Sequence, residues 1–526
     1  MTRVQEIVEP QPQESLVAAM LEPAFYPKPP DRVTHKETHI SHLFFAGDLV
    51  YKVKKAVRYS FLDYSTLGKR RHFLQEELRL NRRLAPSVYL GVMPISFDDL
   101  GWRLGGWAEP AEYTLVMRRL PERRMLPFLL ETHQATPAMM RELAETLARF
   151  HAAADPLKRI EPQGYLAAVE QQWAENHAEI EPFVGHLIER DSYDAIKHYG
   201  DEFIRRHADL FMRRAEQGWI RDVHGDLHCE HICFAPEGIQ IFDCIEFSAK
   251  LRRCDLAAEI AFLVMDIEAR GGGALAELLL GRYLDLIGDP ELRLLLPFGK
   301  CYRALVRGKV YALRGNTGYT EAMRYFNYAN SIVWQSRQPY LIMISGLTGS
   351  GKSTLARALG ERLGLAVINS DAVRKRVTGK SGRQKVAFQT GIYSATATEK
   401  TYAKMTREAE KLLQAGRGAI LDATFIRRAD RERVVRLTEK RQIPLLVIHC
   451  SAAEAVAEKR LARRSAEGMD ISDGRWEVFL EQKKSSEPLD EIPSDLRLEL
   501  NTEAATDQLA SDCEKSLRTR LACLPS

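Results

Sequence analysis

A glycine-rich segment in the last third of the chain constrains the fold more than any other feature of this sequence. The apolar run LIMIS at 341–345 leads directly into the segment GLTGSGKST at 346–354, and the helical text LARALGERLG follows. The segment satisfies the pattern G-x4-G-K-[S/T], in which backbone N–H groups turn inward and bind phosphate oxygens. This order predicts a strand, a phosphate-binding loop and a helix of an α/β domain.

The positions of this loop have distinct predicted roles in binding a nucleotide. The glycines let the backbone close around phosphate oxygens, and Lys352 reaches the terminal phosphates. Ser353 can ligate Mg²⁺ through its hydroxyl. The sequence thus predicts ATP and Mg²⁺ as cofactors, and it predicts these nucleotide-binding residues: Gly346, Gly349, Gly351, Lys352, Ser353 and Thr354.

Two aspartates follow further strand-like runs of the same region. Helical text alternates there with apolar runs, as in a doubly wound parallel sheet, at 366–370, 418–422 and 445–449. Asp371 could accept a proton from an acceptor hydroxyl, and Arg374 could hold an anionic part of the acceptor. Helix capping by Asp371 is the alternative. Asp422 ends the third strand, where a carboxylate associated with Mg²⁺ is expected.

A group of arginines near residue 460 predicts a lid over the transferring phosphate. Arg460, Arg463 and Arg464 lie at helical spacings of three and four, so they can converge on one face. We take Arg463 as the representative lid residue. A solvated basic face is the alternative.

Residues 340–500 resemble the small P-loop kinases that phosphorylate hydroxyls, a group that includes gluconate kinase, chloramphenicol phosphotransferase and the kinase half of polynucleotide 5′-kinase. In the last of these, an aspartate after an Asn-x-Asp strand end supplies the base, and an arginine three residues later clamps the acceptor. Asn369-Ser370-Asp371 and Arg374 match that pattern. The resemblance implies these two roles for Asp371 and Arg374.

The first part of the chain carries a second group of chemically active side chains. The segment VHGDLHCEHI at 223–232 is followed by IFDCIE at 241–246, so that Asp226 and Asp243 flank a predicted hairpin. Phosphoryl transfer needs one carboxylate at the acceptor hydroxyl and another that holds Mg²⁺ on the phosphates. Two aspartates fixed on adjacent backbone meet this need.

Residues 35–335 resemble the aminoglycoside phosphotransferase family, which is built like a protein kinase and carries His-Gly-Asp-x-His-x-x-Asn before a metal-binding aspartate. The resemblance implies that Asp226 is the catalytic base and Asp243 a Mg²⁺ ligand. His231 stands at the asparagine position as the second metal ligand, although a ring nitrogen suits Mg²⁺ less well than oxygen does. The whole chain resembles two-part bacterial proteins with this domain followed by an ATP-binding kinase domain.

In the same fold a strand lysine binds the nucleotide phosphates and pairs with a glutamate on the next helix. Lys52 and Lys54 both lie on the strand-like text VYKVKK and face the same side. We prefer Lys52, with Glu77 as its partner, and an exposed surface lysine is the alternative.

Histidines and cysteines gather around the two aspartates and raise a zinc site as another interpretation. They are His224, His228, Cys229, His231, Cys233 and Cys244. Their spacing matches none of the usual paired zinc frameworks. The kinase interpretation instead has the histidines orient the catalytic loop and the cysteines pack as small apolar residues.

The predicted fold class is an α+β protein-kinase-like two-lobed domain, residues 1–335, followed by an α/β P-loop kinase domain, residues 340–526. The small lobe ends near residue 118. Residues 1–30, with six prolines, predict an irregular lead-in. Hairpins are expected at 39–57 and 232–247, and a helix at 68–84.

Charge and composition narrow the classes of partner. The net charge is only +4, far below that of a typical nucleic-acid-binding protein, with −3 over residues 1–340 and +7 over 341–526. Residues 151–250 carry 19 acidic and 10 basic side chains, which would attract a cationic acceptor, or which simply form a helical surface. No apolar run spans a bilayer and the start lacks a signal-peptide profile, so we expect a cytoplasmic protein with reduced thiols and no membrane partner.

These features predict an ATP-dependent phosphotransferase that acts on a small-molecule hydroxyl through two nucleotide-binding modules. One alternative makes the first module a regulatory or sensing pseudo-kinase, because His231 replaces the asparagine. Another makes the second module a 5′-hydroxyl kinase for nucleic acid, a partner that is not favoured but stays open. The sequence does not determine the acceptor or the oligomeric state.

Overall fold

A computed structural model describes residues 11–59, 62–99, 101–105, 109–157, 160–337, 339–378, 395–467 and 475–522. The chain forms two compact units. Unit 1 contains residues up to 180 together with 200–309, and unit 2 contains 181–199 together with 310 onward. Thus two helical segments that precede the predicted boundary at 336–340 pack with the second half of the chain. The domain boundary at 336–340 stays a prediction from the sequence.

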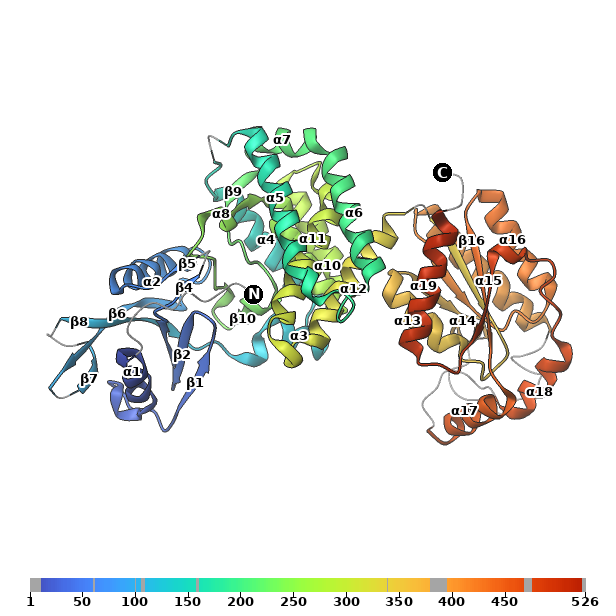
Figure 1. Cartoon of the computed structure of the whole chain (residues 1–526), viewed down its shortest axis with the longest axis horizontal. Coiled ribbons are helices and arrows are strands. Elements are labelled where there is room, and N and C mark those ends of the chain that lie inside the picture. The colour runs from blue at the N-terminus through green and yellow to red at the C-terminus, as the bar shows by residue number, and fades with distance from the viewer. Residues whose placement is uncertain are drawn as a thin grey trace. The chain divides into compact units, whose positions relative to one another are not determined.

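Unit 1 begins with a small lobe built on a six-stranded antiparallel sheet. Its elements are α1 (Gln11–Leu21), β1 (Val33–Glu37), β2 (Ser41–Ala46), β3 (Leu49–Lys54), β4 (Arg58–Tyr59), β5 (Leu62–Asp63), α2 (Leu67–Asn81), β6 (Tyr89–Asp98), β7 (Gly101–Leu104) and β8 (Pro110–Arg118). The strand order is β1-β2-β3-β8-β6-β7, while β4 and β5 pair separately. Helices α1 and α2 cover opposite faces of the sheet (Figure 1).

Helix α1 corrects the prediction of an irregular lead-in. Its side chains Leu16 and Met20 are fully buried against Phe44 and Tyr51 of the sheet. Pro12 lies in the first helical turn, where a proline costs no hydrogen bond. The prediction is wrong for Gln11–Leu21 because packing against the sheet, which a local pattern does not encode, stabilises the helix.

The hairpin and the helix predicted for the small lobe are confirmed. Strands β2 and β3 pair antiparallel, and Gly47 has a φ of 61° in the turn between them. Helix α2 begins after Thr66, whose hydroxyl accepts a hydrogen bond from the Lys69 N–H, and it ends at Asn81, three residues before the predicted end. Strand β3, which carries Lys52 and Lys54, lies in the interior of the sheet between β2 and β8.

The large lobe of unit 1 consists mainly of helices around the buried helix α9. Its helices are α3 (Leu126–Glu131), α4 (Pro137–Ala153), α5 (Pro162–Ile180), α7 (Ala208–Glu216), α8 (Ala249–Arg252), α9 (Leu256–Ala269) and α10 (Gly273–Ile287), and α6 (Arg190–Arg206) and α11 (Leu292–Ala312) extend into unit 2. Although eleven of its fourteen residues are buried, α9 is too short to cross a bilayer, and no helix in the described ranges has the length and apolarity to do so.

Four short strands of the large lobe hold the loops that carry Asp226 and Asp243. They are β9 (Ile220–Asp222), β10 (Ile232–Ala235), β11 (Gly238–Ile241) and β12 (Arg253–Asp255). Strands β10 and β11 form the predicted hairpin, and β9 pairs with β12. Asp255 caps α9 and is bound by the fully buried Arg214, which also binds Asp289. This buried ion cluster fixes the start of α9 beneath the loop that follows β9.

Unit 2 contains a five-stranded sheet in which every neighbouring pair is parallel. Its elements are α12 (Tyr319–Gln335), β13 (Leu341–Ser345), α13 (Lys352–Leu363), β14 (Ala366–Asn369), α14 (Ser370–Thr378), α15 (Ala395–Gln414), β15 (Ala419–Asp422), α16 (Arg428–Arg441), β16 (Leu445–Ser451), α17 (Glu454–Glu467), α18 (Trp476–Ser485), β17 (Arg497–Asn501) and α19 (Thr506–Ala522). The strand order is β14-β15-β13-β16-β17. The predicted doubly wound parallel sheet is confirmed, and β17 is a fifth strand that the sequence patterns did not reveal.

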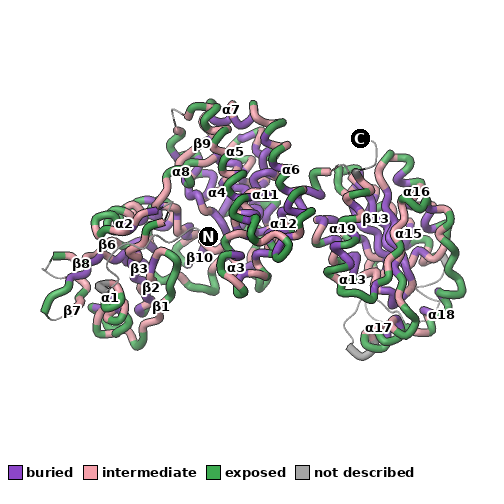
Figure 2. The backbone as a smooth tube through the Cα atoms, viewed as in Figure 1, coloured by how far each residue is buried: buried purple, intermediate pink, exposed green. Residues whose placement is uncertain are grey.

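Helices cover both faces of this sheet, whose central strands are buried (Figures 1 and 2). One apolar core joins α12, α13 and α19 to the sheet, and the other joins α14, α15 and α16 to its opposite face. Every residue of β13 and β15 is buried. The strand that leads into the glycine-rich loop is therefore held rigidly from both sides.

A buried carboxylate joins the helices of unit 2 that come from different parts of the sequence. Glu514 on α19 accepts hydrogen bonds from Asn330 (2.9 Å) and Trp334 (3.0 Å) on α12. It also binds Arg362 on α13 (3.0 Å) and Arg518 one turn further along α19 (2.5 Å). Burial raises the pKa of Glu514, but Arg518 and the hydrogen bonds outweigh it and hold this pKa below its usual value.

We predict that Glu514→Leu lowers the free energy of unfolding of unit 2 by about 3 kcal/mol, because two arginines lose a buried partner. Native-state hydrogen exchange of α13 and α19 in the full-length chain measures this change. As a control, Glu481→Leu removes only an exposed ion pair with Lys484 and should cost at most about 1 kcal/mol. Equal effects of the two substitutions would contradict the assigned role of Glu514.

Candidate functional site

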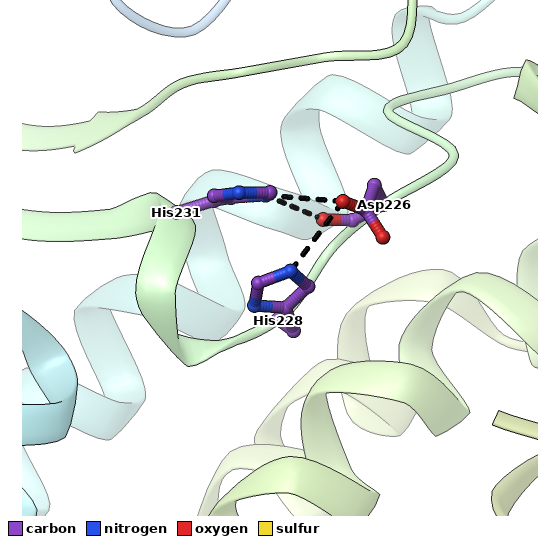
Figure 3. A group of neighbouring side chains, drawn as sticks. All are labelled: Asp226, His228 and His231. Atoms are coloured by element: carbon purple, nitrogen blue, oxygen red, sulfur yellow. Dashed lines mark hydrogen bonds and ion pairs between the residues drawn. The ribbon is translucent and has the colours of Figure 1, made fainter. Parts of the chain in front are cut away.

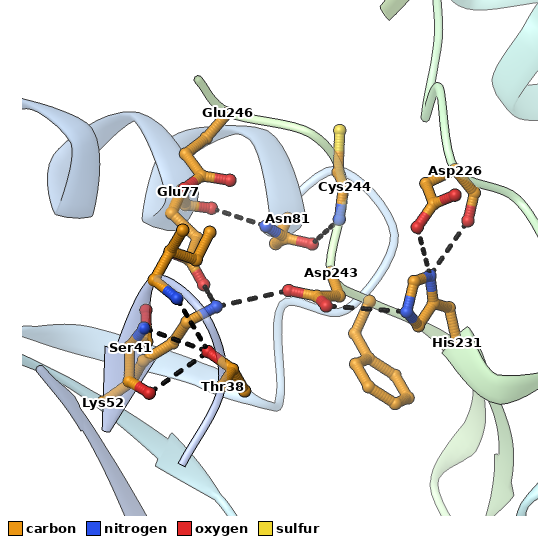
Figure 4. A network of polar contacts seen from close by, with 12 residues as sticks. Thr38, Ser41, Lys52, Glu77, Asn81, Asp226, His231, Asp243, Cys244 and Glu246 are labelled. Atoms are coloured by element: carbon orange, nitrogen blue, oxygen red, sulfur yellow. Dashed lines mark hydrogen bonds and ion pairs between the residues drawn. The ribbon is translucent and has the colours of Figure 1, made fainter. Parts of the chain in front are cut away.

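Lys52 on β3 lies at the centre of a polar network in unit 1 (Figure 4). Its Nζ atom is 2.6 Å from Glu77 Oε1 on α2 and 3.3 Å from Asp243 Oδ1. Burial lowers the pKa of Lys52, but the carboxylates of Asp243 and Glu77 outweigh it and raise this pKa well above its ordinary value. The structure therefore brings Lys52 together with Glu77 and Asp243, and the lysine is charged.

Lys54, the other candidate lysine, is fully buried and has different partners. Its Nζ atom binds Glu77 Oε2 at 2.8 Å and Glu246 Oε1 at 2.5 Å, and it lies 4.7 Å from the centre of the Tyr64 ring. Tyr64 also donates a hydrogen bond of 2.7 Å to Glu246. Lys54 has no exposed surface, so its role is to hold Glu77 in place. The other carboxylate oxygen of Glu77 binds Lys52.

Asp243 is held by backbone contacts from the small lobe. Its φ of 63° lies in the left-handed region, which few residues other than glycine adopt. The Tyr89 hydroxyl on β6 accepts a hydrogen bond from the Asp243 N–H (3.1 Å), and the Asn81 side chain on α2 accepts one from the Cys244 N–H (2.8 Å). The strained loop after β11 is thus fixed by two residues that no sequence motif marks.

The loop that carries Asp226 is fixed from the large lobe. Glu259 on α9, which is fully buried, accepts hydrogen bonds from the backbone N–H groups of His224 (2.9 Å) and Gly225 (3.2 Å). Burial raises the pKa of Glu259. His224 lies 2.9 Å from the carbonyl oxygen of Phe242, the residue before Asp243. The two aspartate loops are therefore joined through His224.

Two histidines lie beside the Asp226 carboxylate (Figure 3). Asp226 Oδ2 is 3.4 Å from His228 Nε2 and 3.6 Å from His231 Nδ1. His231 also reaches Asp243, with 3.5 Å between its Nε2 atom and Asp243 Oδ2, so this ring lies between the two aspartates (Figure 4). Burial raises the pKa of Asp226, but His228 and His231 outweigh it and hold this pKa well below its usual range.

Asp243 shows the same electrostatic pattern as Asp226. Burial raises its pKa, whereas Lys52 and His231 hold it well below its usual range. Both carboxyl groups are consequently ionised at neutral pH. Because each side chain keeps more than a third of its surface exposed, a ligand in solution can reach them.

The cysteines near this cluster are buried thiols. Burial raises the pKa of Cys233 to about 11 and of Cys244 to about 12, which makes both poor metal ligands at neutral pH. Among the described residues, Asp226, His228 and His231 form a group without cysteine whose possible ligand atoms lie within 4.8 Å of one another. The surroundings of the cysteines fit packing and do not support the zinc interpretation.

A cavity of about 90 Å³ adjoins the Asp226 loop. Leu251 lines it and also touches the loop, since a Cβ atom at Gly225 would lie 3.1 Å from the Leu251 carbonyl oxygen. Arg303 on α11 also lines the cavity, and its guanidinium carbon lies 4.7 Å from the centre of the Phe262 ring. The buried Nε atom of Arg303 has no hydrogen-bond partner among the residues described. The cavity therefore combines apolar walls with the Arg303 guanidinium, whose charge lowers the pKa of the buried Glu259 against the larger, opposite effect of burial.

In unit 2 the glycine-rich loop adopts a conformation that only its glycines permit. Gly346 has a φ of 140°, and a Cβ atom there would lie 2.3 Å from the Cys450 carbonyl oxygen on β16. The Thr348 N–H donates to Gln482 on α18 (2.9 Å), and Lys352 Nζ lies 3.4 Å from the Leu347 carbonyl oxygen. Ser353 and Thr354 follow in the first turn of α13.

The predicted carboxylates of unit 2 meet at the carboxyl ends of neighbouring strands. Asn369 at the end of β14 donates to Asp422 Oδ2 (2.6 Å) at the end of β15. The Asn369 side-chain oxygen accepts from the N–H groups of Asp371 and Ala372, so Asn369 and not Asp371 caps α14. Asp371 Oδ1 accepts a 2.8 Å hydrogen bond from Arg374. The structure thus brings Asp371 and Arg374 together as one ion pair.

Arg460 on α17 contacts a residue that supports the glycine-rich loop. Arg460 donates to the Thr502 hydroxyl (3.0 Å) and carbonyl (2.6 Å), and that hydroxyl donates to the Ser350 carbonyl (2.6 Å). Arg463 is exposed on the same helix. Its lid role stays a prediction.

The site in unit 2 has features that fit nucleotide phosphates and Mg²⁺. Asp422 is 1% exposed, and its Oδ1 atom has no partner within the described part of the chain, as is also true of the buried Ser350 hydroxyl. Buried polar atoms without partners are rare and call for a ligand or water. A carboxylate and a serine hydroxyl are oxygen ligands of the kind Mg²⁺ prefers.

Comparison with known proteins gives two family matches. Residues 46–295 match the phosphotransferase enzyme family, and residues 341–489 match an AAA domain. An uncharacterized protein of Mycobacterium tuberculosis strain H37Rv is 33% identical over 447 residues, which cover 83% of this chain and 87% of that protein. An uncharacterized protein of Mycobacterium bovis matches to the same extent.

Solved structures that resemble the chain include small-molecule kinases. A Mycobacterium tuberculosis APS kinase in complex with AMPPNP and APS is 18% identical, with 34% of this chain and 98% of that chain covered and a TM-score of 0.26. A gluconokinase from Sinorhizobium meliloti is 20% identical, with 35% and 95% covered and a TM-score of 0.26. From the family matches and the mycobacterial relatives, the chain belongs to the phosphotransferase enzyme family, as a member whose kinase-like domain is followed by a P-loop domain.

Proposed function

We propose that the chain transfers the γ-phosphate of ATP to the hydroxyl of a small molecule and binds ATP in each of two modules. The observation that carries this proposal is the convergence of Lys52, Glu77, Asp243 and Asp226, from separate parts of the sequence, on one network. Such a set supplies a phosphate-binding cation, a metal ligand and a base. The family matches support the reaction class and leave the acceptor open.

In unit 1 each side chain has a role that follows from its surroundings. Lys52, held by Glu77, would bind nucleotide phosphates, because its amino group is charged and lies at the edge of the buried network. Asp243 and His231 would hold the divalent cation, which when bound neutralises charge on the transferring phosphate. Asp226, ionised and half-exposed, would accept the proton of the acceptor hydroxyl.

In unit 2 the glycine-rich loop would bind the phosphates through backbone N–H groups and Lys352. Ser353 and Asp422 would hold Mg²⁺. Asp371 would accept the proton from a second acceptor, and Arg374, which pairs with it, would hold an anionic part of that acceptor. A 5′-hydroxyl end of nucleic acid is one such acceptor, and the Asn369–Asp371–Arg374 contacts are the observation that favours it.

The acceptor of the first module is best sought among small molecules that carry an anionic group. Arg303, Lys250 and Arg253 bring positive charge to the lining of the cavity beside the Asp226 loop. The acidic cavity residue, Asp255, is already neutralised by Arg214. This local charge opposes the cationic acceptor that the acidic composition of 151–250 suggests.

A screen of the full-length chain with labelled ATP tests this proposal. Hydroxy acids, phosphorylated sugars, neutral sugars and aminoglycosides serve as acceptors, and transfer to at least one hydroxyl is expected, with anionic acceptors first. If the chain binds ATP but labels no acceptor, the sensing alternative for the first module, which His231 favours, takes its place.

For the second module, we predict that Lys352→Ala lowers ATP turnover about 10²–10³-fold, because the loop loses its phosphate-binding charge. The rate is measured in the full-length chain with Asp226→Asn present, so that only unit 2 contributes. Arg357→Ala, which removes an exposed charge from the same helix, is the control and should leave the rate unchanged. Similar rates for both variants would refute the loop assignment.

For the first module, Asp226→Asn should lower phosphoryl transfer about 10²–10⁴-fold, because the base is lost. ATP affinity should stay nearly unchanged, since this carboxylate faces the acceptor. The measurement uses the Lys352→Ala background and compares Glu237→Gln, an exposed change at the tip of the β10–β11 hairpin. A large loss of ATP affinity in Asp226→Asn would make Asp226 a structural residue instead.

A further inference from the structure

The ring of His231 is fixed in one orientation by a backbone contact. Its Nδ1 atom lies 2.9 Å from the Asp226 carbonyl oxygen. A carbonyl oxygen only accepts hydrogen bonds, so Nδ1 carries the hydrogen, and in the neutral ring Nε2 presents a lone pair. Histidines that ligate metals usually donate their other N–H to a carbonyl or carboxylate in this way.

The lone pair on Nε2 points at another electron-pair donor. Asp243 Oδ2 is 3.5 Å away, longer than the 2.7–3.2 Å typical of an N–H···O hydrogen bond. Two ligand atoms each about 2.1 Å from one metal ion lie about 3.0–3.4 Å apart, depending on the angle at the metal. The separation of His231 Nε2 and Asp243 Oδ2 is therefore close to that of two ligands of one cation (Figure 4).

The neighbouring group of Asp226, His228 and His231 is a poorer cation site, although its atoms are close together (Figure 3). His228 Nδ1 accepts a hydrogen bond from the Glu230 N–H (3.3 Å), so this nitrogen is not available to a cation. Arg307 Nη1 lies 3.3 Å from the Nε2 atom of the same ring. A cation there would face the Arg307 guanidinium, which leaves Asp226 available as a base.

We infer that His231 Nε2 and Asp243 Oδ2 bind the divalent cation of the first module directly, and that this nitrogen ligand gives the site a preference for Mn²⁺ or Co²⁺ over Mg²⁺. The inference rests on the proposed function and names the metal class of that same site. Imidazole favours later first-row ions, whereas carboxylates and phosphate oxygens suit Mg²⁺ and Mn²⁺ alike. Mn²⁺ therefore fits the mixed set of ligands.

Pulsed electron paramagnetic resonance on the Mn²⁺-loaded full-length chain tests the inference, because echo modulation by ¹⁴N reports a directly bound imidazole. We expect this modulation in the wild-type chain, with Mn²⁺ alone or with a non-hydrolysable ATP analogue, and its loss in His231→Asn. The ligands proposed in unit 2 are oxygens and give no such signal. No ¹⁴N modulation in the wild-type chain, or its persistence in His231→Asn, would overturn the inference.

Metal affinities provide a second readout that does not depend on turnover. The ratio of Mn²⁺ to Mg²⁺ affinity should fall about tenfold or more in His231→Asn, because an amide oxygen replaces the ring nitrogen. Asparagine is the residue that the aminoglycoside phosphotransferase motif has at this position. His72→Gln, an exposed histidine on α2, is the control and should leave the ratio unchanged. An unchanged ratio in a folded His231→Asn chain would contradict the inference. Binding of the ATP analogue, measured separately, tests the proposed function itself.

Discussion

Glu77 shares its carboxylate between two lysines of one strand, and the arrangement of the site in unit 1 depends on this contact. One oxygen binds the fully buried Lys54 and the other binds Lys52, which extends to Asp243. Buried charges of this kind are costly unless each is paired, so α2, β3 and the loop after β11 are held in one relative position. The same helix supplies Asn81, which fixes the backbone beside Asp243.

In unit 2 the candidate site is held in position mainly by backbone conformation, whereas in unit 1 it is held by charged side chains. Its loop follows a fully buried strand, and Gly346, Gly349 and Gly351 have positive φ angles, which let a backbone turn its N–H groups inward. Contacts from Gln482 and Thr502 support the loop from helices and strands later in the sequence. Glu514 in turn anchors the helix that follows the loop.

Much of the fold and the site followed from the sequence because local patterns carried them. The glycine-rich loop, both hairpins and the two aspartates are encoded in short runs whose spacing has a direct physical meaning. Other features depend on contacts between distant residues. Helix α1 needs the sheet that Leu16 covers, and β17 is an edge strand with no continuous apolar run. The contact of Tyr89 with the Asp243 backbone and the contact of Arg460 with Thr502 both depend on how elements pack together, which sequence periodicity does not specify.

In the function we propose, one chain binds two nucleotides, one at each set of residues. Isothermal titration calorimetry of the full-length chain with a non-hydrolysable ATP analogue and a divalent cation tests it most directly, because stoichiometry does not require the acceptor to be known. We expect two molecules of the analogue to bind per chain. Saturation at one molecule or none would contradict it.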